Sequence, residues 1–129
     1  MKVSDYIIEH LARQRGIREV FTIVGGANMH LVDSIARAKD IRYVCTQHEQ
    51  AAAMAAIGYS RTRGGLGAAL LTSGPGGTNA LTGLCCAWTD SVPVLFLSGQ
   101  VAIRDYTDGR TIRQLGVQQI NIVDMVRPA

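Results

Sequence analysis

Long apolar runs and paired cysteines are both missing from this sequence of 129 residues. No stretch approaches the roughly 20 apolar residues that a membrane-spanning helix needs, so we expect no membrane segment. The N-terminus carries Asp5, Glu9 and His10 among its apolar residues, which is not the pattern of a secretory signal. The three cysteines are an odd number without metal-ligand spacing, which predicts a reduced, cytoplasmic protein without a metal site.

An excess of one charge is also lacking. The chain has 13 basic and 10 acidic side chains, and the basic residues are scattered from Lys2 to Arg127. Aromatic residues make up only 5% of the chain, too few to interleave with a basic stripe. A nucleic-acid surface needs a denser basic patch, so the composition argues against nucleic acid as a partner.

Short apolar runs alternate with helical patterns along the chain, and the length suits one domain with a single core. Strands are expected at 20–24, 41–45, 67–71 and 93–97, and helices between Ser4 and Gly16 and at 29–38, 47–61 and 78–88. Strands separated by single helices indicate a parallel sheet that is covered on both faces. We therefore predict a three-layer α/β/α domain that spans residues 1–129.

The last third of the chain breaks this alternation. Residues 101–113 are charged and contain Gly109, which predicts a surface loop, and a short helix is expected within 117–126. The α/β pattern stops before the architecture is complete. This predicts that the chain is a fragment or a truncated product.

Four segments are expected at the carboxyl ends of the strands, where ligands bind in open parallel sheets. They are 25–26, 46–49, 72–79 and 98–100. The glycines of 74–77 lack the lysine of a phosphate-binding loop, and on the residues alone they could serve only tight turns.

Glu49 is the sharpest single candidate. Thr46 to Glu49 fits a capping box, in which Glu49 at the third helical position satisfies a backbone amide. The alternative is chemical, because the alanines that follow allow close approach of a neighbouring element or a partner surface. A carboxylate beside such a dry surface can exchange a proton near neutrality.

Five linked segments carry a more specific pattern. They are Val24 to Ala27, His48 to Arg61, Thr72 to Asn79, Asp90 to Pro93 and Ser98 to Val101. In order and spacing they resemble the N-terminal, pyrimidine-binding domain of thiamine-diphosphate enzymes of the acetohydroxyacid synthase and pyruvate oxidase group. The resemblance covers essentially the whole chain and implies the thiamine-diphosphate-binding fold. It also implies that residues 1–129 are the N-terminal fragment of a longer, multi-domain enzyme.

The resemblance also implies roles for particular residues. This type of domain holds the aminopyrimidine ring of thiamine diphosphate, and Glu49 hydrogen-bonds a ring nitrogen to activate the cofactor. Gln118 matches a glutamine that faces the reacting centre, although it could also be a solvated loop residue. The cofactor-binding positions implied are Val24, Gly25, Gly26, Glu49, Thr72, Pro75, Gly76 and Asn79.

The implied reaction is the decarboxylation of a 2-keto acid with carboligation, as in acetolactate synthase. A diphosphate-binding domain of a neighbouring subunit or chain would hold the diphosphate and Mg²⁺, so this chain alone is expected to be inactive and the enzyme to be a homo-oligomer. FAD occurs in some members of the group, but this type of domain does not hold it. Val24 replaces a common proline, and Val117 and Gln119 replace the phenylalanine and glutamate that usually flank the glutamine. These departures leave the second substrate open.

Two other interpretations of the chain remain. It could be a non-catalytic dimerisation or interaction module that keeps the fold, or one subunit of a split thiamine-diphosphate decarboxylase. Glu49 distinguishes the interaction module from an enzyme, because a pure interaction module has no need of that carboxylate.

Overall fold

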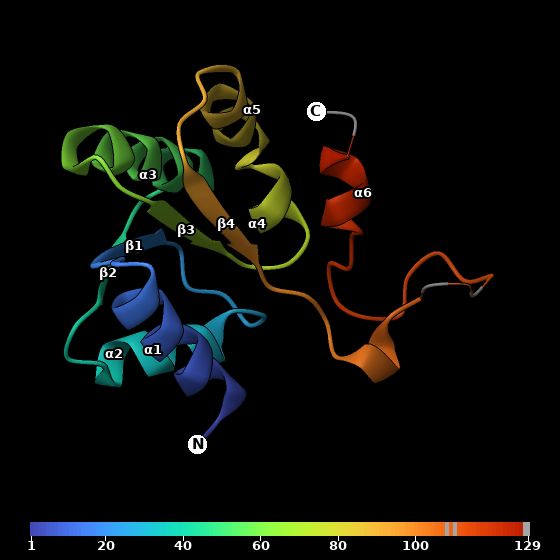
Figure 1. Ribbon diagram of the computed structural model, residues 1–129. Helices are drawn as coiled ribbons and strands as arrows, with labels where there is room; N and C mark the ends of the chain where they lie inside the picture. The colour runs from blue at the N-terminus through green and yellow to red at the C-terminus, as the bar shows by residue number, and fades with distance from the viewer. Residues whose placement is uncertain (108, 110, 128–129) are drawn as a thin grey trace.

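Four parallel strands form the centre of the structure (Figure 1). The computed structural model describes residues 1–107, 109 and 111–127. The strands are β1 (Glu19–Thr22), β2 (Arg42–Cys45), β3 (Gly67–Leu71) and β4 (Val94–Ser98). Their order in the sheet is β2-β1-β3-β4, with every pair parallel. The two central strands, β1 and β3, therefore end side by side at the carboxyl edge of the sheet.

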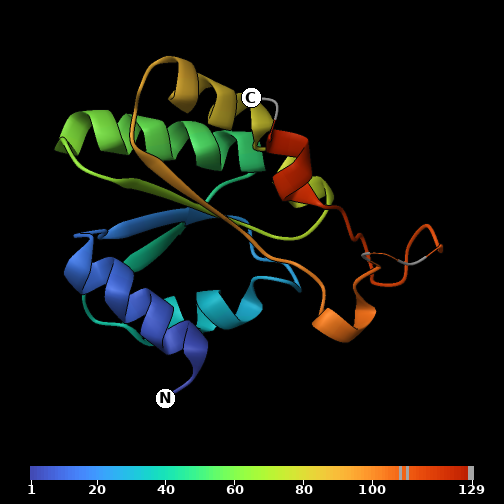
Figure 2. The same ribbon diagram turned by 45° about the vertical axis from the view of Figure 1, so that its right-hand side comes forward.

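Helices cover both faces of the sheet, as Figure 2 shows. The helices are α1 (Val3–Gln14), α2 (Met29–Arg37), α3 (Glu49–Arg63), α4 (Pro75–Thr78), α5 (Leu81–Thr89) and α6 (Ile122–Val126). α1 and α2 lie on one face, and α3, α4 and α5 lie on the other. The predicted three-layer α/β/α architecture is confirmed.

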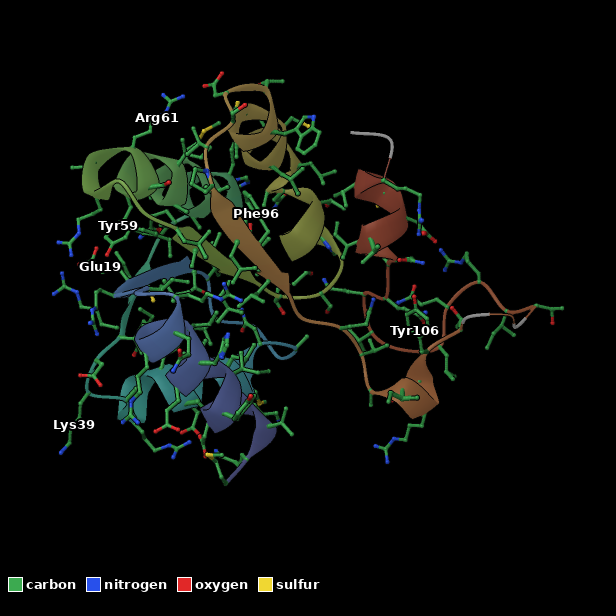
Figure 3. All side chains as sticks on the ribbon, in the orientation of Figure 1. Glu19, Lys39, Tyr59, Arg61, Phe96 and Tyr106 are labelled. Carbon is green, nitrogen blue, oxygen red and sulfur yellow. The ribbon has the colours of Figure 1, made fainter. Side chains whose placement is uncertain are left out.

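Side chains alternate between the two faces along the central strands, as the pleat of a strand requires. Val20 and Leu70 belong to the core beneath α1 and α2, whereas Phe21 and Ala69 belong to the core beneath α3. Phe96 of β4 packs on the α3 side, against buried residues of β3 and α3 (Figure 3). The apolar runs of β1 and β3 thus each supply side chains to the cores on both faces of the sheet.

The two edge strands differ from the expectation that every strand is covered on both faces. β3 is fully buried, but β2 exposes Arg42, Tyr43 and Cys45 to solvent, and β4 is only partly buried throughout. Both strands lie at an edge of the sheet, where the flanking helices cover them less completely. In the described part of the chain, no helix has the length and apolar character needed to cross a membrane.

The segment after β4 extends away from the sheet, and Tyr106 lies on this extension (Figure 3). The expected loop at 101–113 contains one short 3-10 helix, η1 (Ile103–Asp105). The chain then returns, and α6 comes back to α4: a methyl group on Gly77 would lie 3.1 Å from the Ile122 side chain. Asp108 and Arg110 lie outside the described residues.

Candidate functional site

The loop that follows β1 brings two glycines to the carboxyl edge of the sheet. The backbone of Gly25 lies so close to Thr72 that an added Cβ would come within 2.5 Å of Thr72 Oγ1. Gly26 is exposed, and an added Cβ there would meet nothing. Val24 precedes them with a side chain that is 52% exposed, so it lies at the border of the contact network described below.

Asn28 holds this loop in place, and the sequence analysis missed it. Its side chain is 1% exposed. The Gly25 N–H donates to Asn28 Oδ1 at 2.8 Å, and Asn28 Nδ2 donates to the Ile23 carbonyl at 3.0 Å. A buried amide with both groups bonded folds the backbone tightly around the paired glycines. The only signal of this role in the sequence is that Asn28 is a polar residue directly before the apolar positions of α2.

Thr72, directly after β3, is the centre of the contacts between loops. Its Oγ1 accepts a hydrogen bond from the Ala27 N–H at 3.3 Å. An added Cβ on Gly76 would lie 2.6 Å from Thr72 Cγ2, so Gly25 and Gly76 both approach the same threonine. The two loops that follow β1 and β3 meet here because their strands are neighbours in the sheet.

The turn after Thr72 brings Gln118 to the same edge. Gly74 has a φ of +59°, and an added Cβ would overlap the Gln118 carbonyl oxygen. Pro75 then begins α4 at a position where its missing N–H is tolerated. Gln118 itself has a φ of +54° and is exposed. The Gln118 backbone thus packs on the turn that precedes Pro75, and its side chain makes no hydrogen bond to the described residues of the site.

Glu49 is the first residue of α3, and the capping-box interpretation is wrong. His48 is the N-cap, and its Nδ1 accepts a hydrogen bond from the Gln50 N–H at 3.1 Å. Thr46 instead donates from Oγ1 to the His48 carbonyl at 2.9 Å. The helix starts later than expected, so Glu49 is not at the third helical position, and its side chain is directed to another element.

The Glu49 carboxylate lies over the turn that contains Gly76. Its Oε2 accepts a hydrogen bond from Asn79 Nδ2 at 2.9 Å. Its Oε1 would lie 3.4 Å from a Cβ on Gly76 and accepts no hydrogen bond from any described residue. The structure therefore joins Glu49, Gly76, Asn79 and Thr72 in one group at the end of the sheet, in which Glu49 and Thr72 are half-buried, Gly76 is buried and Asn79 is exposed.

The small residues of α3 are used inside the domain. Ala52, Ala53 and Ala56 are fully buried. An added Cβ on Gly83 of α5 would overlap Ala53 Cβ, and one on Gly67 of β3 would overlap the Ala56 carbonyl. The expected close approach thus occurs, and the elements that approach are α5 and β3.

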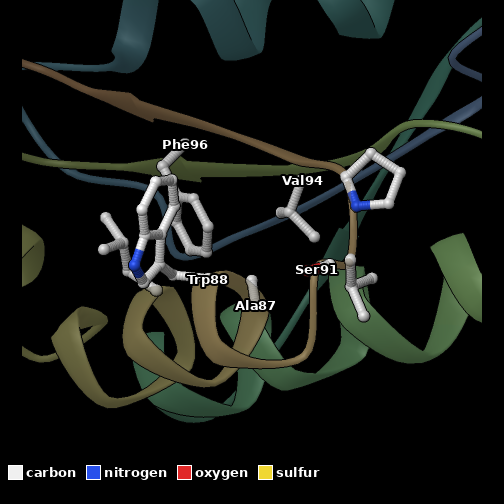
Figure 4. Close-up of a pocket in the computed structure, with 8 residues that line it drawn as sticks. Ala87, Trp88, Ser91, Val94 and Phe96 are labelled. Carbon is white, nitrogen blue, oxygen red and sulfur yellow. The ribbon is translucent and has the colours of Figure 1, made fainter. Parts of the chain in front are cut away.

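A separate hollow lies away from these residues. It has a volume of about 580 Å³ and lies where α5, β4 and the turn between them meet (Figure 4). Trp88, 71% exposed, and Phe96 contribute to its apolar wall, and none of the described residues that line it is ionisable. Chemistry that needs a titratable group is better placed at the carboxyl edge. No three metal-ligating side chains gather anywhere in residues 1–107, 109 and 111–127.

Comparison with known proteins gives a consistent result. The model of the family described as "Thiamine pyrophosphate enzyme, N-terminal TPP binding domain" matches residues 1–125. The chain is 44% identical over 98 residues to an acetolactate synthase large subunit of Haemophilus influenzae, which covers 76% of this chain and 17% of that protein. It is 48% identical over 92 residues to an acetolactate synthase of Arthrospira platensis, covering 69% of this chain and 16% of that protein.

A plant relative shows the same proportions. The chloroplastic acetolactate synthase of Arabidopsis thaliana is 44% identical over 103 residues, which is 80% of this chain and 15% of that protein. The chain therefore matches only about a sixth of the length of these curated relatives.

Proposed function

Because this chain belongs to the family of N-terminal TPP-binding domains of thiamine pyrophosphate enzymes, we propose that the carboxyl edge of its sheet holds the aminopyrimidine ring of thiamine diphosphate. The proposed ring site lies between the loop after β1 and the start of α4. Glu49, Gly25, Gly26, Thr72, Pro75 and Gly76 belong to it, with Val24 at its border and Asn79 behind Glu49, to which its amide is bonded.

The hydrogen bonding of the Glu49 carboxylate is the observation that supports this proposal most directly. One oxygen is fixed by Asn79, and the other is free to accept a hydrogen bond as far as the described residues go. Oε1 is thus the atom at which Glu49 would exchange a proton with a ring nitrogen. Gly26 is exposed and an added Cβ there would meet nothing, which leaves its backbone open to a flat ring, so the residues present fit the group.

The remaining site residues shape this position. Asn28 and Thr72 fix the loop after β1, which keeps Gly25 and Gly26 at the edge of the sheet. Gly74 allows the Gln118 backbone to pack on the turn, so Gln118 can approach a substrate from the side of the loop after β4. We assign Gln118 to substrate contact and Glu49 to cofactor activation.

When bound, thiamine diphosphate supplies the electron sink for 2-keto acid decarboxylation, while the protein supplies placement and a proton acceptor. Relatives named acetolactate synthase favour decarboxylation followed by carboligation as the reaction of the longer enzyme. We further propose that this enzyme is a cytoplasmic homo-oligomer. A second domain, on a neighbouring subunit or chain, would hold the diphosphate and Mg²⁺.

The test is the Glu49→Gln substitution in the longest natural chain that contains these residues. Turnover of a 2-keto acid, measured with thiamine diphosphate and Mg²⁺, should fall by roughly 10²–10⁴-fold, the usual contribution of a positioned acid–base group. Glu9→Gln, at an exposed glutamate of α1, is the matched control and should retain full activity. Full activity of Glu49→Gln, or no turnover by a folded wild type that binds the cofactor, would overturn the proposal.

A further inference from the structure

The hydrogen bond between Asn79 and Glu49 joins two elements that are distant in sequence. Glu49 begins α3, and Asn79 lies between α4 and α5. The backbone of Asn79 is itself fixed, because its N–H donates to the Pro75 carbonyl at 2.9 Å and its φ and ψ are right-handed helical. The Asn79 side chain therefore extends from a fixed backbone position when its amide donates to the Glu49 carboxylate.

Close packing one helical turn further along sets the separation between the two residues. Ala53 follows Glu49 by four positions on α3, and Gly83 follows Asn79 by four positions. Residues four apart lie on the same face of a helix, so Ala53 lies one turn beyond Glu49 on α3, while Asn79 directly precedes Ala80, the N-cap of α5. Because Gly83 has no Cβ, its backbone lies directly against Ala53, and this contact holds Asn79 opposite Glu49.

We propose that Asn79 is a positioning residue that selects which oxygen of Glu49 carries the exchangeable proton. The Asn79 Nδ2 group can only donate, so the oxygen that it binds, Oε2, must remain an acceptor. A proton on this carboxyl group then resides on Oε1, the oxygen beside Gly76. The catalytic consequence of this selection rests on the proposed function, whereas the coupling between the two side chains does not.

The coupling is tested first in the chain of 129 residues by NMR. The side-chain amide resonances of ¹⁵N-labelled Asn79 should shift as the pH is lowered and Glu49 takes up a proton. In Glu49→Gln this shift should disappear, while the backbone spectrum stays that of the wild type. Asn79 resonances that titrate equally in both proteins, or in neither, would overturn the proposal.

The catalytic effect is tested in the longest natural chain, with thiamine diphosphate and Mg²⁺ bound. The readout is the rate of hydrogen–deuterium exchange at C2 of the cofactor, measured beside the cofactor Kd. Asn79→Leu should lower the rate about tenfold, as expected for one lost hydrogen bond to a charged group, with little change in Kd. Asn79→Asp should lower the exchange rate further, because this variant places a second carboxylate beside Glu49. If Asn79→Leu does not fold, Asn79→Asp serves as the test in its place.

Two controls separate positioning from structural damage. Thr82→Asp adds the same charge at an exposed position of α5 and should exchange at the wild-type rate. Adding Asn79→Leu to Glu49→Gln should cause no further loss, because Asn79 acts only through Glu49. A change confined to Kd, or effects that multiply in the double variant, would overturn the role of Asn79 alone. No exchange in the wild type would overturn the proposed function and this role together.

Discussion

The face of the sheet beneath α1 and α2 is packed with large aliphatic side chains, whereas the face beneath α3 and α5 combines the rings of Phe21 and Phe96 with alanines and glycines. Ile8, Ile17 and Ile35 are among the largest fully buried side chains on the first face. On the second face, Ala53 and Ala56 contact positions that only glycine can occupy. Both faces are buried, but long side chains make the contacts on the first face, whereas backbone and Cβ atoms make the closest contacts on the second.

The two faces therefore contribute differently: the first mainly stabilises the fold, and the second mainly fixes the position of the helices. Burying large aliphatic groups supplies most of the hydrophobic free energy and tolerates small shifts of the backbone. Contacts between small residues bury less area, but they fix the distance between two helices within narrow limits. The site residues Glu49 and Asn79 lie on the small-residue face, where their separation is set by backbone packing.

The largest expected effect is a cavity on the aliphatic face. Ile35→Ala removes a side chain that is 1% exposed and should lower the free energy of unfolding by ~2–5 kcal/mol. Urea denaturation monitored by circular dichroism measures it. Ile112→Ala, at an exposed isoleucine, should change stability by less than about 0.5 kcal/mol. Equal losses at the two positions would contradict the assignment of this core.

A smaller effect is expected when a single methyl group is added to the other face. Gly83→Ala should destabilise the protein by about 1–3 kcal/mol through overlap with Ala53. Gly58→Ala is the matched control, because Gly58 is also inside a helix but faces open space. That substitution should stabilise by about 0.5–1 kcal/mol, the usual gain of alanine over glycine in a helix. Gains at both glycines would show that α3 and α5 are not closely packed.

The smallest effect concerns the polar contacts that border the aliphatic face. A hydrogen bond from Ser34 and then the Arg37 guanidinium hold the pKa of Asp5 down to about 2, below its ordinary value of 3.8. Because this pKa is lowered on folding, the ionised Asp5 stabilises the protein above pH 4. That contribution is lost as the pH falls from about 4 to about 2.

We therefore expect the wild type to exceed Asp5→Asn in stability at pH 7, by a modest margin because these groups are partly exposed. Thermal unfolding of both proteins between pH 2 and pH 7 measures the difference, which should shrink below pH 4. Asp40→Asn, at an exposed carboxylate outside this network, is the control. A difference that stays constant down to pH 2 would contradict the lowered pKa of Asp5.

Much of the fold could be predicted because its signals are local. The strand at Gly67–Leu71 was predicted with its observed bounds, and the other three strands were placed within two residues. The helix expected at 78–88 is split between the last residue of α4 and most of α5. α4 starts earlier than expected, at Pro75, because the positive φ of Gly74 allows a turn directly before it. Glu49 was correctly expected near the start of the helix that follows the second strand, but its position within α3 was misjudged.

The sequence by itself determined the class of fold and the edge of the sheet at which the site residues meet. Apolar runs separated by helices leave a parallel sheet as the solution that buries them, and parallel strands end at a common edge. Only the tertiary structure decided the order β2-β1-β3-β4. It also decided that Asn28 folds the glycine loop and that Asn79 binds Glu49. These contacts join residues distant in the chain, and helix and strand periodicity carries no information about which distant side chains meet.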